Sequence, residues 1–234
     1  MTFKEIKSNI NPSKVNPPDK VEIDKLIKIK LDKTFEAIGL ANKLNDRIWF
    51  SDFDDSGQKN VVHFQLTKGL GAVFIFGKCF NFVPIISGTE KLTYHKTDKS
   101  TTVHLFDSSD SIQIRSLFGK KKPLQLTLIN QSEFSKSLDV FIRYGLIAIK
   151  QWFDNNPSIE DCIKTCLQQI SLGENYLLHN PSQDYLISFL SAKLVDKSRM
   201  NYHLNKFLVN RNKPINKDVE MAIRKQLNKL VTKK

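Results

Sequence analysis

The stretch that most constrains the fold is residues 47–83, RIWFSDFDDSGQKNVVHFQLTKGLGAVFIFGKCFNFV. Aromatic and β-branched residues recur there in short runs, which Asp-Asp-Ser-Gly at residues 54–57 and Gly-Leu-Gly at residues 69–71 separate into three predicted strands. In residues 61–67 apolar and polar side chains alternate, as in a strand with one buried face. In residues 72–83 both alternating sets are apolar, which is typical of a central strand covered on both sides. The sequence therefore predicts a sheet that needs helices as cover.

Helical periodicity flanks this stretch. Apolar residues return every three or four positions across residues 21–38, with Gly39 in the place of a left-handed C-cap, and again across residues 132–154. Further strands are predicted where apolar residues alternate, at Leu92, Tyr94 and Lys96, at Val103 and Leu105, at Ile112 and Ile114, and at Leu124, Leu126 and Leu128. Short connections favour antiparallel pairing. We therefore predict an α+β fold with a mostly antiparallel sheet of about six or seven strands, covered by helices.

The chain divides by composition into three predicted segments. Residues 1–20 hold three prolines among Asn, Ser and Lys, which indicates a flexible arm. Residues 21–175 make up the α+β sheet domain, including a helix that starts at Ser158. Residues 176–234 are predicted to be a basic, all-helical segment, with its last helix opening at Asn216.

Positive charge is concentrated in this C-terminal segment. The whole chain carries +12, and residues 193–234 hold twelve basic against three acidic residues, a net charge of +9. In the last predicted helix, Val219, Ile223, Leu227 and Leu230 form an apolar stripe, and the basic residues off this stripe are Lys217, Arg224, Lys225 and Lys229. Two interpretations remain open. The basic face is either simply solvated, or it contacts nucleic acid or an acidic protein.

A second basic cluster is Lys120, Lys121 and Lys122, between Gly119 and Pro123. The pattern predicts a hairpin tip. Exposed lysines there discourage association of sheet edges, and they are also candidates for binding a polyanion.

Two groups of side chains are candidates for metal or acid–base chemistry. Asp52, Asp54 and Ser56 before Gly57 resemble the start of a calcium loop, but His63 stands where the loop needs a bidentate Glu, so an acidic hairpin turn is the alternative. His63, His95 and His104 each fall in a predicted strand and either converge or stand isolated.

Cys162 and Cys166 are four residues apart on one predicted helix face, which suits two metal ligands or two buried thiols. Cys79 completes a sparse set without a C-x-x-C pair, as expected in a reducing cytoplasm. No apolar signal region or membrane span is found, so we predict a cytoplasmic protein without a membrane partner. We assign no catalytic, cofactor-binding or metal residue.

The chain also resembles an uncharacterised bacterial family, the domain of unknown function numbered four-three-zero-four, over roughly residues 34–153. The likeness lies in the Ile-Gly-Leu step at residues 38–40, Trp49-Phe50, the run from Val62-His63-Phe64 to Phe74-Ile75-Phe76-Gly77, and Trp152. The resemblance implies an α+β fold and brings no known activity.

These observations favour a non-catalytic cytoplasmic binding or adaptor protein that contacts a macromolecule. One alternative is a nucleic-acid-binding protein that uses the basic C-terminal helices. Another is a hydrolase or nuclease with carboxylates or histidines on the open face of the sheet.

Overall fold

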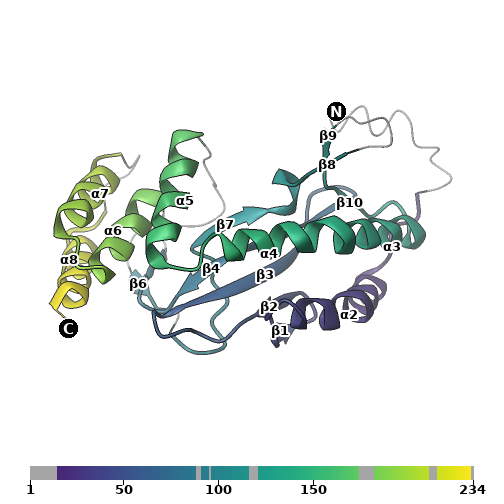
Figure 1. Cartoon of the computed structure of the whole chain (residues 1–234), viewed down its shortest axis with the longest axis horizontal. Coiled ribbons are helices and arrows are strands. Elements are labelled where there is room, and N and C mark those ends of the chain that lie inside the picture. Colours follow the sequence, from purple (N-terminus) through teal and green to yellow (C-terminus); the bar gives the residue numbers. More distant parts are fainter. Residues whose placement is uncertain are drawn as a thin grey trace. The chain divides into compact units, whose positions relative to one another are not determined.

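The computed structural model describes residues 15–87, 91–94, 96–115, 121–173, 182–210 and 215–232 (Figure 1). The chain forms two compact units. Unit 1 comprises Met1–Ser51, Val62–Phe76 and Asp107–Gln151, and unit 2 comprises Asp52–Val61, Gly77–Phe106 and Trp152–Lys234. The segment boundaries predicted from composition stay predictions.

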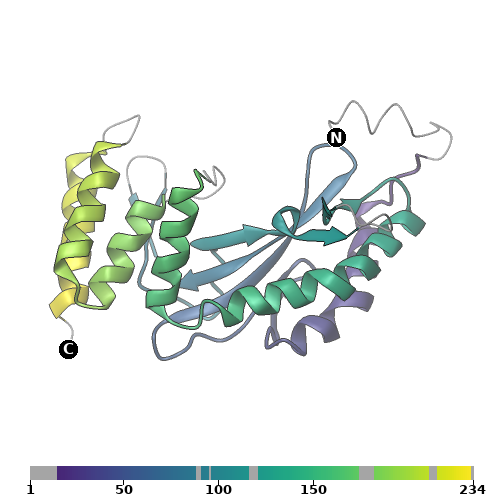
Figure 2. The same ribbon diagram turned by 45° about the horizontal axis from the view of Figure 1, so that its top comes forward.

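The main sheet has six strands within the described residues. Its order is β1 (Asn42–Asn45), β2 (Ile48–Phe50), β3 (Gln58–Leu66), β4 (Gly71–Phe80) and β10 (Leu126–Thr127), and β7 (Leu105–Ser108) also pairs with β4. β1 and β2 are antiparallel, with Asn42 opposite Phe50, and β10 is antiparallel to β4, with Leu126 opposite Ala72. Figure 2 shows β3 and β4 as the long strands. The predicted α+β class with an antiparallel sheet is confirmed.

Two separate hairpins accompany the main sheet. β5 (Ile85–Ser87) pairs with β6 (Lys91–Thr93), and β8 (Gln113–Arg115) pairs with β9 (Lys121–Pro123), both antiparallel. The sequence did not predict β1, β5 or β9, because these strands are short and lack apolar alternation. The predicted strand through Tyr94 and Lys96 was too long, since β6 ends at Thr93.

The first described helix is α2 (Lys20–Glu36), which begins one residue before the predicted helix. Asp19 caps it. The Glu22 N–H donates to the Asp19 carboxylate and the Asp19 N–H donates to Glu22, which makes a capping box. Gly39 has φ +87°, so the predicted left-handed residue after the helix is confirmed. Of the predicted arm, residues 1–14 lie outside the described part of the chain.

The predicted helix at residues 132–154 is interrupted. α3 (Gln131–Val140) runs into a π-helical turn, η3 (Phe141–Gly145), and then into α4 (Leu146–Asp154). Position 145 of this turn favours glycine, because a Cβ there would lie 2.4 Å from the Phe141 ring. A π-turn is invisible to a search for 3.6-residue periodicity.

Aromatic packing joins the helices of unit 1 to its part of the sheet. Phe74 of β4 is fully buried and stacks on Phe141 with ring centroids 4.0 Å apart. Phe35 of α2 contacts the same Phe74 ring, with centroids 5.9 Å apart. α2 and η3 therefore pack against the same face of β4 through Phe74. The sequence predicted that both helices cover the sheet but not that they share a face.

Helices α5 (Ile159–Ser171), α6 (Gln183–Lys193), α7 (Lys197–Val209) and α8 (Lys217–Thr232) lie side by side in both views of unit 2 (Figures 1 and 2). α6 is buried along its length from Tyr185 to Ala192 because α5, α7 and α8 pack around it. α8 buries Val219, Ile223 and Leu227, which confirms three of the four residues of the predicted apolar stripe. The fourth, Leu230, is only partly buried, and Val231 is buried instead. Ser158 caps α5 as predicted.

Candidate anion-binding pocket

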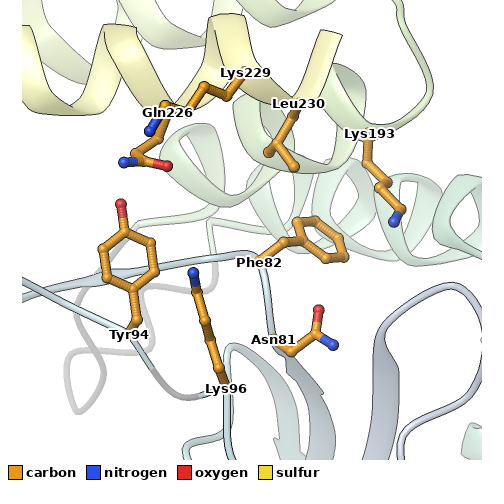
Figure 3. Close-up of a pocket in the computed structure, with 8 residues that line it drawn as sticks. All are labelled: Asn81, Phe82, Tyr94, Lys96, Lys193, Gln226, Lys229 and Leu230. Carbon is orange, nitrogen blue, oxygen red and sulfur yellow. The ribbon is translucent and has the colours of Figure 1, made fainter. Parts of the chain in front are cut away.

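A hollow of about 370 Å³ opens in unit 2 beside α8 (Figure 3). We call it the lysine pocket, because three of its walls carry a lysine. Its lining residues are Asn81, Phe82, Tyr94, Lys96, Lys193, Gln226, Lys229 and Leu230. All belong to unit 2, and they come from three regions that are distant in the sequence.

Each wall of the lysine pocket is fixed by the end of a regular element. Lys193 is the last residue of α6, and Gln226 and Lys229 are neighbours on one face of α8 because they are three residues apart. Asn81 follows β4 directly, and Lys96 stands shortly after β6. α8 contacts β6. The pocket therefore depends on the packing of α8, which its buried apolar stripe provides.

Two of the lysines are oriented by aromatic rings. The Lys96 ammonium lies 4.6 Å from the centroid of the Tyr94 ring, and the Lys193 ammonium lies 5.2 Å from the centroid of the Phe82 ring. Figure 3 shows Lys96 and Lys193 on either side of Phe82. A cation–π contact holds an ammonium group in place without neutralising its charge.

No carboxylate lines the lysine pocket among the described residues. Within that part of the chain, Lys96, Lys193 and Lys229 also take part in no ion pair. Three uncompensated positive charges thus face one small concave surface. Concave walls of low dielectric strengthen such a field, so the pocket is suited to an anion.

Polar groups without charge complete the pocket. Asn81 and Gln226 contribute side-chain amides, which can donate and accept hydrogen bonds. The hydroxyl of Tyr94 is buried and has no hydrogen-bond partner among the residues that the structure describes. Burial raises the pKa of Tyr94, so its hydroxyl keeps its proton and remains a donor.

The predicted basic residues of α8 are only partly brought to the pocket. Lys229 lines it, and the same Lys229 also borders an open hollow along α8, which we call the α8 face and which is lined by Met221, Arg224, Lys225, Asn228, Lys229 and Thr232. Arg224 is paired with Glu220, with 2.8 Å between Nη2 and Oε1. Lys217 lies in the first turn of α8 and lines neither hollow.

The second predicted basic cluster belongs to unit 1. Lys120 lies outside the described residues. Lys121 and Lys122 are exposed in β9, and Lys122 borders a hollow of about 270 Å³ whose lining includes both Glu133 and Lys136. Because that hollow already contains a carboxylate, its charge is mixed.

Counting charges along the sequence overstated the basic character of residues 193–234. Arg199 makes two hydrogen bonds of 2.8 Å to the Glu160 carboxylate and a third contact, of 3.1 Å, to Asp196. Lys206 lies 3.9 Å from Asp184. The sequence analysis did not predict Lys96 as a binding residue. Its only indication in the sequence was its position two residues after Tyr94 in a short predicted strand.

The acidic turn predicted as an alternative to a calcium loop is closed by its own hydrogen bonds. Asp54 Oδ1 accepts the N–H groups of Ser56 and Gln58 and the Ser56 hydroxyl. Burial opposes ionisation, but these hydrogen bonds outweigh it and lower the pKa of Asp54. Its oxygen is therefore engaged in the turn itself.

The structure does not bring the three candidate histidines together in one described site. His63 belongs to unit 1 and His104 to unit 2, and His95 lies outside the described residues. His104 is buried, and its Nδ1 accepts the backbone N–H of Phe80 at 3.1 Å. In the described ranges no group of three or more His, Cys, Asp or Glu side chains is placed to hold a metal ion.

The three cysteines are free and buried. Burial raises the pKa of Cys79 and of Cys162 to about 12. The pKa of Cys166 is raised for the same reason. These side chains therefore remain protonated thiols at neutral pH and are not activated nucleophiles.

Comparison with known proteins gives no further indication of function. No protein-family model, curated protein or solved structure matches the chain. The resemblance to the uncharacterised bacterial family stays a prediction. Across the described ranges, no helix is both long and apolar enough to span a membrane.

Proposed function

We propose that this chain is a non-catalytic, cytoplasmic binding protein that contacts nucleic acid through the lysine pocket and the α8 face. The observation that carries the proposal is the convergence of Lys96, Lys193 and Lys229 on one hollow that, in the described part of the chain, no carboxylate lines. Lysine side chains that lack an internal partner are available to replace the counterions of a phosphate backbone. The free cysteines support the cytoplasmic location.

Nucleic acid fits this surface better than an acidic protein does. The α8 face continues the positive charge beyond the pocket, because Lys225 and Lys229 both border it. A phosphate backbone carries evenly spaced charges that can follow such a track. The amides of Asn81 and Gln226 and the apolar Leu230 in the pocket suit a ligand that carries polar edges and flat faces besides its charge.

The proposal is tested by fluorescence anisotropy with labelled DNA and RNA over a range of salt concentrations. We expect the logarithm of the affinity to fall linearly with the logarithm of salt concentration, with a slope of about −2 for three phosphates of a single strand. The triple variant Lys193→Gln, Lys225→Gln, Lys229→Gln should bind more weakly and show a flatter slope.

The control is a triple variant with the same loss of charge elsewhere. Lys25, Lys28 and Lys33 are exposed on α2 of unit 1, and changing all three to Gln should leave the binding almost unchanged. Equal weakening by the two triple variants would show that only net charge matters. Absence of binding at low salt would overturn the proposal and direct the search to an acidic protein.

A further inference from the structure

The size of the lysine pocket limits which form of nucleic acid can enter it. Its volume of about 370 Å³ lies near the lower end of the range for small-molecule sites, about 300–1,000 Å³. Such a hollow holds one nucleotide. A duplex keeps its bases stacked and paired inside, so it can offer the pocket only backbone phosphates from its outer surface.

The lining of the pocket matches the phosphate and the base of a nucleotide. Lys96 and Lys193 supply ammonium groups for phosphate oxygens, and their contacts with Tyr94 and Phe82 hold them on either side of the hollow. Leu230 and the Phe82 ring give an apolar surface for the flat faces of a base. The base edge needs hydrogen-bonding groups, and the amides of Asn81 and Gln226 are of this kind.

A path for the rest of a strand begins at Lys229. This residue borders both the lysine pocket and the α8 face, so a backbone that leaves the pocket beside it reaches Lys225 and Asn228 directly. Charged and amide side chains along one helix face suit a sugar–phosphate backbone without reading its sequence. The side chain of Met221, which is 60% exposed, adds apolar surface to the same face.

We infer that the lysine pocket takes one unpaired nucleotide, and that the protein therefore binds single-stranded nucleic acid in preference to duplex. The inference rests on the proposed function, because it presupposes that the pocket and the α8 face bind nucleic acid at all. It adds a division of roles. The pocket selects an unpaired nucleotide, whereas the α8 face contacts the backbone of any nucleic acid.

The division of roles is tested with a labelled oligothymidylate and a hairpin duplex that carries the same number of phosphates. The parent should bind the oligothymidylate at least about tenfold more tightly than the duplex. Lys96→Gln should weaken single-strand binding at least about tenfold, as expected for losing one charge-assisted hydrogen bond, and should change duplex binding less than about twofold.

Two further variants make the test specific to the pocket. Lys225→Gln removes a charge from the α8 face alone, so it should weaken binding of both probes by the same factor. Gln226→Ala removes a side-chain amide that lines the pocket and does not border the α8 face, so it should weaken binding of the single strand alone. Thermal unfolding of each variant verifies that the fold is retained.

The outcomes separate this inference from the proposed function. If neither probe binds the parent, the proposed function is wrong and the inference falls with it. If the parent binds both probes equally, or if Lys96→Gln weakens binding of both probes by the same factor, nucleic-acid binding stands but the unpaired nucleotide in the pocket is refuted.

Discussion

Lys43 and Arg47 of unit 1 and the pocket lysines of unit 2 have different partners. In unit 1 Lys43 pairs with Asp32 and Asp46, at 2.8 Å to each carboxylate. Burial opposes the charge on Lys43, but hydrogen bonds to both carboxylates outweigh it and raise its pKa. Arg47 pairs in the same way with Asp24. In unit 2 Lys96 and Lys193 of the pocket lie against aromatic rings, and among the residues that the structure describes no carboxylate lines the pocket.

This difference separates stabilising charges from charges available for binding. A partly exposed ion pair contributes only about 0–1 kcal/mol to folding, but it removes both charges from the field that a partner meets. The pocket lysines keep their charge. A contrast in ion pairing therefore locates a binding surface better than net charge along the sequence does.

The hydrophobic cores differ as well. Unit 1 centres on aromatic rings around Phe74, whereas the core of unit 2 is largely aliphatic and helical, with a lysine buried at its edge. Lys78 is 5% exposed and its ammonium lies 5.9 Å from the centroid of the Phe153 ring. Four changes, ordered by the size of their expected effect on folding, test these contrasts.

The largest effect should come from the aromatic core of unit 1. Phe74→Ala removes a ring that contacts Phe35, Phe64 and Phe141, and we expect it to lower the free energy of unfolding by about 3–5 kcal/mol through lost burial and a residual cavity. Urea unfolding measures the change. Gln65→Ala, on the half-buried alternate of β3, should stay within about 0.5 kcal/mol. Similar losses in both variants would contradict this account of the core.

Lys78, one of two buried lysines among the described residues of unit 2, should oppose folding. Burial lowers the pKa of Lys78, so the unfolded chain holds this proton more tightly than the folded protein does. Lys78→Met should raise the free energy of unfolding at pH 7 by about 1–3 kcal/mol, because it removes a polar group that burial penalises.

The sign of the pH dependence gives a second measurement. Between the lowered pKa of folded Lys78 and the ordinary pKa of 10.5, raising the pH favours the folded parent, which has already released the proton. The advantage of Lys78→Met should therefore shrink between pH 7 and pH 10 in urea unfolding. Lys197→Met, at an exposed site on α7, serves as the control. A pH-independent advantage would mean that packing, and not charge, caused the gain.

A smaller effect is expected at the turn between α6 and α7. Val195 has φ +63°, a left-handed conformation that is strained for a β-branched side chain. Val195→Gly should relieve this strain. Glycine also makes the unfolded chain more flexible, which opposes folding, so we expect the free energy of unfolding to rise by only about 0.5–1 kcal/mol. Thermal unfolding tests it. Val195→Ala keeps a Cβ and should recover less, and a loss of stability in the glycine variant would refute the strain.

The smallest effect on folding should come from the exposed pair on α8. Glu220→Gln breaks the ion pair with Arg224, and we expect a loss of about 0.2–0.5 kcal/mol. The same change releases the Arg224 charge onto the α8 face, so nucleic-acid affinity measured by anisotropy should rise and its salt dependence should steepen. Asp218→Gln, which removes a carboxylate from the same helix and leaves the Glu220–Arg224 pair in place, is the control. Equal gains in nucleic-acid affinity from both variants would show that the loss of one negative charge, and not the release of Arg224, causes the effect.

Local patterns were sufficient for most of the fold. Aromatic and β-branched runs predicted β3 and β4, and apolar spacing predicted α2 and the buried stripe of α8, because each of these signals depends on residues close in the sequence. The short strands β1, β5 and β9 escaped prediction, since partners elsewhere in the chain, and not their own residues, define them as strands.

Only part of the lysine pocket could be predicted from the sequence, for a related reason. The sequence by itself determined that α8 would have one apolar and one basic face, and this placed Lys229 among the candidates. Only the tertiary structure decided that Lys96 and Lys193 meet Lys229 at one hollow, while Arg199 and Arg224 are paired with carboxylates. Charge compensation acts over a few ångströms in space, between residues that are far apart along the chain, so no count along the sequence can predict it.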